Sequence, residues 1–504
     1  MNLIAFDIGG SGGKMFLGKY TGGSISLHTL HRFEHAAVSM NNGLYWDVLR
    51  IYQELCRGIK KAIEAADDQI DSFGIDSFCN DFALVSPEGD LVTQMRSYRD
   101  NRTIRCLEQL YQIMPEKELY QATGNQNAPF NCLMQLGTMV LENQSYLFKN
   151  NTLLFLPDLL LYYMTGIRKT EFTIASVSQM FDFSTSSWHP GILKKFSIPK
   201  QIFAPIAAPG SILGRTSEAF NRELGTTGFP AATVCEHDTA SAFLASSGLP
   251  NSAIISCGTW AIVGAETDAP VINSYGYKYN IANEGSIKNH HRILKNVMGT
   301  WLLQEIRAEY RSRNLEYTYT EMEAAALTAP PFAYLIDVDD ERFYSPGSMI
   351  EKIQDYCMLR YGSAPSSLGQ IVRCVNESLA MKYRWNIEKI AHLTGIHFES
   401  VNIIGGGSQS GLMCQFTANV MNLPVISGPA EATALGNIIV QLAAHKKIET
   451  IAQGRELIRN SFAAKRYTPV NAQEWEKQYT TFKNRFYLNL TRGSPKVRQD
   501  VLQY

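Results

Sequence analysis

The stretch Leu3–Tyr20, with the sequence LIAFDIGGSGGKMFLGKY, constrains the fold more than any other part of the chain. Two apolar runs rich in β-forming residues, Leu3–Phe6 and Met15–Leu17, flank a turn that contains Gly9, Gly10, Gly12 and Gly13. This pattern predicts a β-hairpin whose tip can lie against a group that leaves no room for side chains.

The residues around this turn are suited to phosphate oxygens. The tip offers backbone N–H groups, the Ser11 hydroxyl and the Lys14 ammonium, and the Asp7 carboxylate can hold, through water, a Mg²⁺ ion bound to the same phosphates. A plain tight turn explains the glycines about equally well. The sequence matches neither the P-loop nor the strand-to-helix dinucleotide motif, so both of those folds are disfavoured.

Composition limits the kind of partner that the chain can have. With 504 residues, of which 45% are hydrophobic, the chain can form a large core, and we expect two domains. Lys and Arg (46) nearly balance Asp and Glu (47), without a long run of one sign, so we expect a small-molecule ligand and neither nucleic acid nor a membrane surface as partner.

The same survey predicts the compartment. The first apolar run ends at Asp7, and no later stretch approaches the ~20 uncharged residues of a membrane span, so we expect a cytoplasmic protein without signal peptide or anchor. The nine cysteines include no C-x-x-C pair, which favours reduced thiols over disulfides or a zinc site.

Periodicity predicts the elements that follow the hairpin. Residues 46–69 predict an amphipathic helix packed on the hairpin's sheet, with apolar positions at Leu49, Tyr52, Leu55, Ile59 and Ile63. The continuous apolar run Leu153–Thr165 predicts a buried strand that enters a buried helix.

Polar residues at the end of a predicted strand mark a candidate site. Asn80 and Asp81 lie between the predicted strands Ser72–Phe78 and Phe82–Val85, and sites gather at strand ends in α/β folds. The segment SYRDNRT, residues 97–103, is either a solvated helix start or part of a sugar-facing surface.

A second corner of this type occurs at AATVCEHDTASAFLASSG. An apolar run ends at Val234, the polar residues Glu236, His237 and Asp238 follow, and small residues then open a helix. Asp238 can be a helix cap, which requires no chemistry, or a carboxylate that is held ionised by the helix N-terminus and accepts a hydroxyl proton. Both roles are compatible.

The second half of the chain repeats the opening theme. Residues 253–266 (AIISCGTWAIVGAE) predict another hairpin with a tight tip, and the segment from Val401 predicts a strand, a triple-glycine turn and a helix from about Ser410. Two phosphate-type hairpins suggest a duplicated domain that closes around one nucleotide. The small residues of EATALGN (431–437) predict only close helix packing.

Taken in order, FDIGGSGGK, GIDSFCNDF, YRDNRT, EHDTASA, SCGTW, LKNVMGTWLLQ, DDERF, IIGGGSQS and EATALGN resemble the FGGY family of carbohydrate kinases within the actin-like ATPase superfamily. The resemblance covers residues 3–469. It implies two α/β, actin-like (ribonuclease H-like) domains with mixed sheets and a nucleotide and sugar cleft between them. Residues 1–246 would carry the sugar pocket and the first phosphate loop, and residues 247–504 the second phosphate loop and the adenosine site.

The resemblance also implies an activity and a set of roles. ATP, with Mg²⁺, would donate its γ-phosphoryl group to a hydroxyl of a ketose, in a monomer or homodimer. Asp238 matches the family's proton acceptor, His237 and Asn296 match sugar contacts, and Asp7 matches the acidic residue near Mg²⁺. The positions that match nucleotide contacts are Gly10, Ser11, Gly12, Gly13, Lys14, Thr259, Gln304, Gly405 and Gly406.

The chain departs from the family pattern in one segment. Family members that phosphorylate L-rhamnulose carry Trp-Gly-Val-Asp where this chain has Phe78–Asp81, FCND. We expect Cys79 and Asp81 to line the sugar pocket, with Cys79 adding a side chain where glycine would permit close approach, unless the thiol points into the core. L-Rhamnulose, phosphorylated at its 1-hydroxyl, is the expected substrate, and L-fuculose or another deoxy-ketose is the alternative.

A different class of protein could share this fold. A non-catalytic nucleotide-binding regulator of the same superfamily would lack the EHD and YRD segments, and some would carry a DNA-binding segment. This sequence contains both segments and has no helix-turn-helix signature with a basic recognition helix. The sequence therefore favours an enzyme.

Overall fold

The computed structural model describes residues 1–66, 69–287 and 290–487. Residues 488–504 of the predicted second domain lie outside this part of the chain. Within it, no helix is both long enough and apolar enough to span a bilayer.

The first sheet is built on the opening hairpin, which forms as predicted. Gly9 lies opposite Gly12, so Gly10 and Ser11 make the tip. β6 and β14 join as parallel strands, and the other neighbours pair antiparallel. In sheet order the strands are β13 (Ser211–Arg215), β14 (Pro230–Thr233), β6 (Ser72–Ser77), β1 (Asn2–Gly9), β2 (Gly12–Thr21) and β3 (Ser24–Glu34).

The second sheet repeats this plan. The hairpin of β15 and β16 takes the place of β1 and β2, β18 pairs antiparallel beside it, and β19 and β20 join as parallel strands. The sheet contains β17 (Ala282–Gly285), β18 (His291–Met298), β16 (Trp260–Thr267), β15 (Ser252–Cys257), β19 (Ser400–Ile404), β20 (Val425–Ser427) and β21 (Lys465–Tyr467). The shared order of three antiparallel and two parallel strands confirms the predicted pair of ribonuclease H-like domains.

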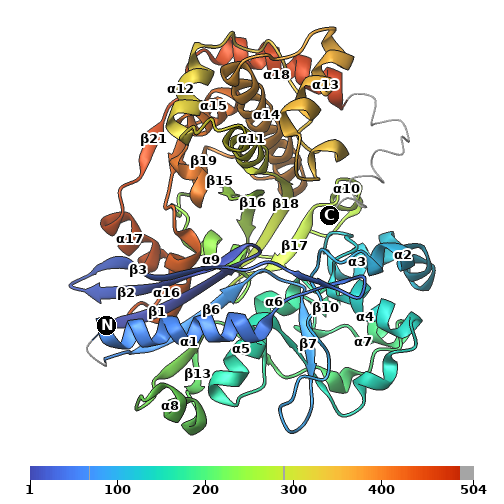
Figure 1. The fold of residues 1–504 in the computed structure, drawn as a ribbon, viewed down its shortest axis with the longest axis vertical. Helices are drawn as coiled ribbons and strands as arrows, with labels where there is room; N and C mark the ends of the chain where they lie inside the picture. Colours follow the sequence, from blue (N-terminus) through green and yellow to red (C-terminus); the bar gives the residue numbers. More distant parts are fainter. Residues whose placement is uncertain (67–68, 288–289, 488–504) are drawn as a thin grey trace.

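Two helices join the sheets. α9 (Asp238–Leu244) and α16 (Ala432–Ala444) share one apolar cluster with residues of β1, β2, β15 and β19. A Cβ atom at Gly436 would lie 1.8 Å from the Ser241 carbonyl oxygen, so only glycine permits this approach of the two helices. The small residues of EATALGN therefore do allow close packing. In Figure 1 the second sheet and its helices lie above the first sheet.

Helices cover the outer face of each sheet. α1 (Val48–Ala65) and α5 (Leu156–Thr165) pack on the first sheet. α1 confirms the predicted helix but not its whole apolar stripe, because Leu49 is 64% exposed and Val48 and Ile51 are buried instead. The second sheet is covered by α11 (Trp301–Ser312), α14 (Leu368–Thr394), α15 (Gly411–Met421) and α18 (Ala472–Phe486).

A separate lobe with its own core is inserted between β6 and β14. β7 (Phe82–Val85) pairs with β8 (Thr152–Phe155), and β8 runs directly into α5, as the apolar run predicted. The lobe also contains α2 (Arg102–Ile113), α3 (Glu116–Thr123), α4 (Cys132–Leu141), α6 (Phe172–Ser176) and α7 (Pro190–Lys195).

The remaining elements are short or peripheral, except α17, which packs on β3 of the first sheet. They are β4 (Val38–Met40), β5 (Gly43–Tyr45), β9 (Thr170–Glu171), β10 (Phe181–Asp182), β11 (Ser187–Trp188), β12 (Ile206–Ala207), α8 (Glu218–Leu224), α10 (Ser274–Lys278), α12 (Tyr319–Thr328), α13 (Met349–Tyr361) and α17 (Ile451–Ser461).

Candidate active site

Asp238 lies at the corner between β14 and α9 that the sequence predicted. It is the first residue of α9, and His237 occupies the preceding cap position, so of the two roles that the sequence allowed the structure does not bear out the helix cap. The Asp238 carboxylate accepts hydrogen bonds from the backbone N–H of Thr239 at 2.5 Å and from its hydroxyl at 3.1 Å. The helix N-terminus thus favours the carboxylate, although burial raises its pKa above the usual range.

Two further carboxylates belong to the same edge of the first sheet. Asp7 of β1 lies opposite Asp76 of β6 and opposite Lys14 of β2. Burial and the Asp238 charge raise the pKa of Asp7 to about 7, while Lys14 acts to lower it. Burial and Asp7 raise the pKa of Asp76, which accepts a 2.6 Å hydrogen bond from Asn437. Sequence analysis missed Asp76, although its place at the end of a strand was a usable signal.

The second domain supplies the residues that orient His237. Arg292 Nη2 lies 3.2 Å from His237 Nδ1 and 2.9 Å from the Glu284 carboxylate, and His237 Nε2 lies 3.5 Å from Asp238. Burial alone would lower the pKa of His237, but neighbouring Cys79 and Glu284 raise it to about 10. His237 thus lies between Asp238 and the Glu284 carboxylate of the second domain.

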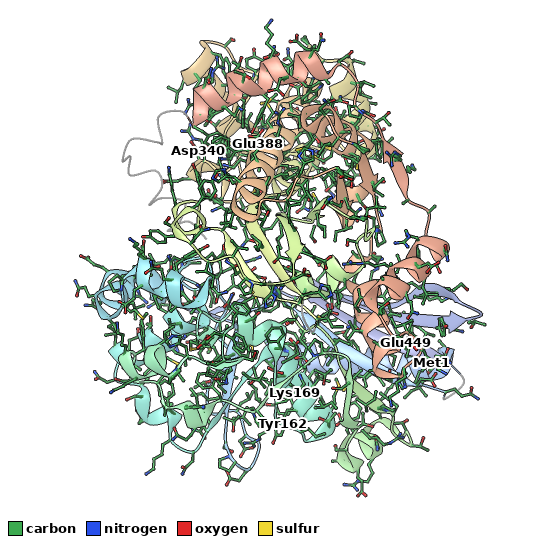
Figure 2. The ribbon with its side chains drawn as sticks, turned by 180° about the vertical axis from the view of Figure 1, so that it is seen from behind. Met1, Tyr162, Lys169, Asp340, Glu388 and Glu449 are labelled. Atoms are coloured by element: carbon green, nitrogen blue, oxygen red, sulfur yellow. The ribbon has the colours of Figure 1, made fainter. Side chains whose placement is uncertain are left out.

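Beneath this corner a buried lysine neutralises part of an acidic cluster. Lys169 forms ion pairs with Asp158, at 2.9 Å, and with Glu236, the residue before His237. Glu171 accepts a hydrogen bond from the Glu236 backbone N–H at 3.2 Å. These residues are almost fully buried, and Figure 2 shows Lys169 inside the first domain. These contacts to Glu236 hold the backbone two residues before Asp238 in place.

The predicted sugar pocket has a carboxyl group within an aromatic wall. Asp81 accepts hydrogen bonds from the Trp46 indole at 2.5 Å and the Tyr98 backbone at 3.1 Å, and its other oxygen has no hydrogen-bond partner among the described residues. Burial raises the pKa of Asp81 to about 7. The rings of Phe78 and Tyr98 pack beside Trp46, with centroids 4.8 and 6.4 Å away.

The FCND segment divides between pocket and core. Cys79 is partly exposed and lies beside His237. Asn80, one of the two polar residues at this predicted strand end, is bonded to the protein itself. Its side-chain oxygen accepts a hydrogen bond from the Cys132 backbone at 3.2 Å, and its side-chain amide donates to the Cys79 sulfur at 3.3 Å. Asn80 has a φ of 75°, a left-handed conformation that Asn tolerates well.

Asn296 stands on the strand that carries Arg292. Side chains alternate along a strand, so Asn296, four residues beyond Arg292 on β18, lies on the same face of that strand. Because Arg292 contacts His237, this face of β18 is directed toward the Asp238 corner.

The first glycine-rich tip meets the YRD segment. A Cβ atom at Gly10 would lie 3.0 Å from the Tyr98 hydroxyl and 3.3 Å from the Arg99 guanidinium. At Gly12 and Gly13 a Cβ atom would collide with Phe33 of β3, and none of these glycines has a positive φ. Packing on Phe33 therefore accounts for two of the four glycines, and only Gly10 faces the YRD segment.

Lys14 is paired across the domains. Its ammonium lies 2.9 Å from the carboxylate of Glu431, the residue that precedes α16, and both side chains are about one-third exposed. The sequence could not predict this ion pair, because 417 residues separate the two partners.

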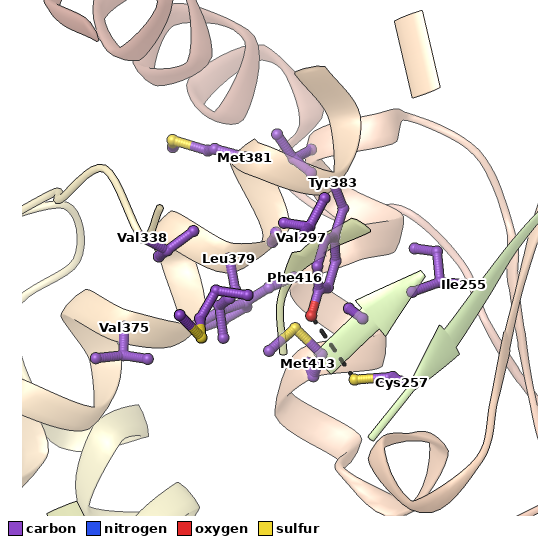
Figure 3. Packing of buried hydrophobic residues seen from close by; sticks show 14 of the residues in the cluster. Ile255, Cys257, Val297, Val338, Val375, Leu379, Met381, Tyr383, Met413 and Phe416 are labelled. Carbon is purple, nitrogen blue, oxygen red and sulfur yellow. Dashed lines mark hydrogen bonds between the residues drawn. The ribbon is translucent and has the colours of Figure 1, made fainter. Parts of the chain in front are cut away.

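The second and third glycine-rich elements lie together. Thr259, at the second tip, lies 3.4 Å from Gln304 of α11. Gly405 has a φ of 80°, and a Cβ atom there would lie 3.0 Å from the Cys257 carbonyl at the end of β15, whereas one at Gly406 would meet only open space. The Cys257 thiol lies 3.7 Å from the Tyr383 hydroxyl within the core shown in Figure 3.

A cavity of about 420 Å³ adjoins the third glycine-rich element. Ser408 and Gln409, which follow the triple glycine, line it together with Glu431 and apolar residues of β2 and β3. The cavity thus borders both the third glycine-rich element and the partner of Lys14.

Duplicated ribonuclease H-like domains, a strand-end carboxylate and paired glycine-rich tips define a two-domain kinase of the sugar kinase type. Comparison with known proteins agrees. The N-terminal domain model of the FGGY family of carbohydrate kinases matches residues 2–245, and its C-terminal domain model matches residues 253–445. The chain belongs to the FGGY family of carbohydrate kinases.

Among curated relatives, a rhamnulokinase of Bacteroides thetaiotaomicron is 36% identical over 484 residues, which cover 96% of this chain and 99% of that protein. One of Oceanobacillus iheyensis is 34% identical over 470 residues, covering 93% and 99%. Among solved structures, a xylulose kinase from Rhodospirillum rubrum has a TM-score of 0.80 at 14% identity, covering 99% of this chain and 100% of that chain. The last comparison supports the fold alone.

Proposed function

We propose that this carbohydrate kinase transfers the γ-phosphoryl group of MgATP to the 1-hydroxyl of L-rhamnulose. The observation that carries the proposal is the meeting of Asp238, Asp7 and Lys14 at one sheet edge, beside the Asp81 pocket. The rhamnulokinases to which the chain is 32–36% identical over most of its length support the choice of sugar. L-Fuculose or another deoxy-ketose is the alternative substrate.

Asp238 is proposed as the proton acceptor. The sugar hydroxyl loses its proton to the Asp238 carboxylate as its oxygen attacks the γ-phosphorus and ADP departs. Phosphoryl transfer has a loose transition state, so a modest base and exact placement of the reactants suffice. His237, held by Glu284 and Arg292 of the second domain, orients the base.

The sugar is proposed to lie between Asp81, Cys79 and the face of β18 that carries Asn296. The Asp81 oxygen without a hydrogen-bond partner in the described chain is buried, and a sugar hydroxyl would satisfy it. His237 completes this set. Because Glu284 and Arg292 reach across from the second domain, domain closure would assemble the pocket and exclude water.

The nucleotide is proposed to lie across both glycine-rich tips. Gly10, Ser11, Gly12, Gly13 and Lys14 would contact phosphates from one side, and Thr259 and Gln304 from the other, with Gly405 and Gly406 against the ribose or adenine. Lys14 would then share its charge between Glu431 and phosphate. On this proposal residues 1–246 carry the sugar pocket and residues 247–504 the adenosine site.

The residues present fit a Mg²⁺ ion that arrives with ATP. The raised pKa of Asp7 and the Asp76 oxygen that lacks a partner among the described residues both favour a nearby cation. The part of the chain that the structure describes contains no set of three His, Cys, Asp or Glu side chains that could hold a metal by itself, which agrees with an ion held chiefly by phosphates and, through water, by Asp7. Such an ion would neutralise phosphate charge.

We also propose a cytoplasmic location and a monomeric or homodimeric state. All nine cysteines are free thiols, and seven are buried, which suits a reducing compartment that supplies ATP.

A panel of ketoses in a coupled ADP-release assay tests the proposed substrate. L-Rhamnulose should give the highest kcat/KM, and ³¹P NMR should identify a 1-phosphate product. A higher kcat/KM with L-fuculose or another ketose would reassign the sugar. ATP hydrolysis without a phosphorylated sugar for any ketose would refute the proposed reaction.

A further inference from the structure

A second cavity, of about 210 Å³, lies in the inserted lobe, outside the candidate active site. β5, the segment before α2, α2 itself and the residues after α4 surround it. β7 and α4 also contribute apolar side chains. Its polar lining, which we call the arginine cavity, consists of Tyr45, Thr93, Gln94, Arg96, Arg102 and Gln144.

Arg102 is the unusual member of this set. It is the first residue of α2 and is only 6% exposed, yet its guanidinium forms neither a hydrogen bond nor an ion pair with any described residue. Burial and the neighbouring Arg96 lower the pKa of Arg102 to about 10. A guanidinium that is this deeply buried and donates no hydrogen bond to the described residues is unfavourable unless another acceptor reaches it from the cavity.

The nearby Asp100 carboxylate already accepts hydrogen bonds from other groups. Asp100 accepts hydrogen bonds from the Arg102 backbone at 2.8 Å and the Leu44 backbone at 2.7 Å, and it forms a 3.1 Å ion pair with Arg96. Asp100 and Glu142 both act on the Arg102 guanidinium through their charges, but neither carboxylate accepts a hydrogen bond from it. Donors reach this space from several elements, which suits a tetrahedral oxyanion better than a flat carboxylate.

We propose that the arginine cavity binds a phosphate-type oxyanion, either free phosphate or the phosphate group of a monoester. This site is distinct from the two glycine-rich tips. It is connected to the proposed sugar pocket through the chain. Phe82, which lines the cavity, follows Asp81, and Tyr98, whose backbone N–H donates to Asp81, lies between Arg96 and Asp100 in the sequence.

Calorimetric titration of the full-length protein tests this proposal. Saturating ADP is present throughout, so that the glycine-rich tips are occupied. Inorganic phosphate is titrated in one arm and a ketohexose 1-phosphate in the other. The variant is Arg102→Met, and the matched control is Arg105→Gln, which removes an exposed arginine from the same helix.

Wild type and Arg105→Gln should bind at least one of the two anions with equal affinity, and Arg102→Met should weaken that binding about tenfold or more, since a hydrogen bond to a charged group is lost. If both anions lose affinity in Arg102→Met, the one that wild type binds more tightly is the preferred ligand, either free phosphate or a phosphate monoester. Binding that Arg102→Met leaves unchanged, or no binding in either arm, would overturn the proposal.

Thermal unfolding separates a binding role from a structural one. In phosphate-free buffer Arg102→Met should melt at or above the wild-type temperature, because a buried charge that donates no hydrogen bond has been removed. Phosphate should raise the Tm of wild type and of Arg105→Gln but not that of Arg102→Met. An equal fall in Tm with and without phosphate would mean that Arg102 is structural.

A second variant keeps the proposal testable if Arg102→Met does not fold. Arg102→Lys keeps the charge but loses the planar fork of donors, so it should bind the anion more weakly than wild type does. Unaltered affinity in Arg102→Lys would contradict the site.

Discussion

The two sheets share one strand order but differ in the chemistry of their edges. At the tip of the first sheet, Asp7 lies opposite Asp76 and Lys14. At the tip of the second, Ser256 lies opposite Ile404 and Ile262. The same topology therefore places titratable side chains at the first tip and uncharged ones at the second. On the proposed reaction, acid–base chemistry would belong to the first edge, and the second edge would hold and position the nucleotide.

The largest effect on stability should come from the charges under the first edge. Lys169→Met leaves Asp158 and Glu236 buried without their cation and should destabilise the protein by about 3–5 kcal/mol. Urea unfolding of the variant and of wild type measures this difference. A loss below about 1 kcal/mol, the range of exposed pairs, would show that the cluster is not a structural support.

Selectivity tests whether the first edge also chooses the sugar. If Cys79 forms the pocket wall beside His237, Cys79→Gly should improve kcat/KM for L-rhamnulose relative to other ketoses by about 1–3 kcal/mol. Steady-state kinetics with several ketoses and the melting temperature are measured together. A lower Tm with an unchanged order of preference would mean that Cys79 is structural.

The pH dependence should distinguish the two edges. If Asp7, whose pKa is raised to about 7, assists Mg²⁺ as proposed, it must lose its proton to do so, and kcat/KM for MgATP should fall about tenfold for each pH unit below 7. Added Mg²⁺ should move this midpoint to lower pH, because a cation favours the carboxylate. A midpoint insensitive to Mg²⁺ would argue against Asp7 near the metal.

The charged form of Asp7 should favour activity but disfavour the folded state. Its raised pKa means that the folded state binds this proton more tightly than the unfolded chain does. Its contribution to stability is therefore complete below its ordinary pKa of 3.8 and is lost as the pH rises to about 7. Activity should thus rise over a range in which this group's contribution to stability falls.

The smallest effect should come from the second edge. Tyr383→Phe removes the hydroxyl that lies 3.7 Å from the Cys257 thiol below the second tip. This contact is weak and uncharged, so unfolding free energy should fall by about 1 kcal/mol or less and kcat should stay unchanged. A loss of unfolding free energy as large as that of Lys169→Met would show that the two edges do not differ in this way.

Local sequence patterns were sufficient to predict most of the strands, helices and turns named above. The hairpins, the apolar run Leu153–Thr165 and the corner at Asp238 depend on near neighbours in sequence, which periodicity and turn residues report. The position of Asp238 within the helix and the exposure of Leu49 were wrong by one helical position each, because burial depends on the sheet against which a helix packs.

Contacts across the domains could not be predicted in the same way. The partner of Lys14 is 417 residues away, and Arg292 meets His237 across 55 residues. Both contacts depend on strand register and on how α9 and α16 hold the two sheets together. No local pattern reports Phe33 as the reason for Gly12 and Gly13, since the collision arises only after β3 has paired with β2.

Single-turnover phosphoryl transfer by Asp238→Asn tests most directly whether the chemistry belongs to the first edge. Asn keeps the size of the side chain and an oxygen that can accept from the Thr239 N–H, but it cannot take a proton. With L-rhamnulose and MgATP the rate should fall by about 10²–10⁴, with ADP affinity within a few-fold of wild type and an unchanged Tm. A folded variant that retains more than about a tenth of the wild-type rate would contradict Asp238 as the base.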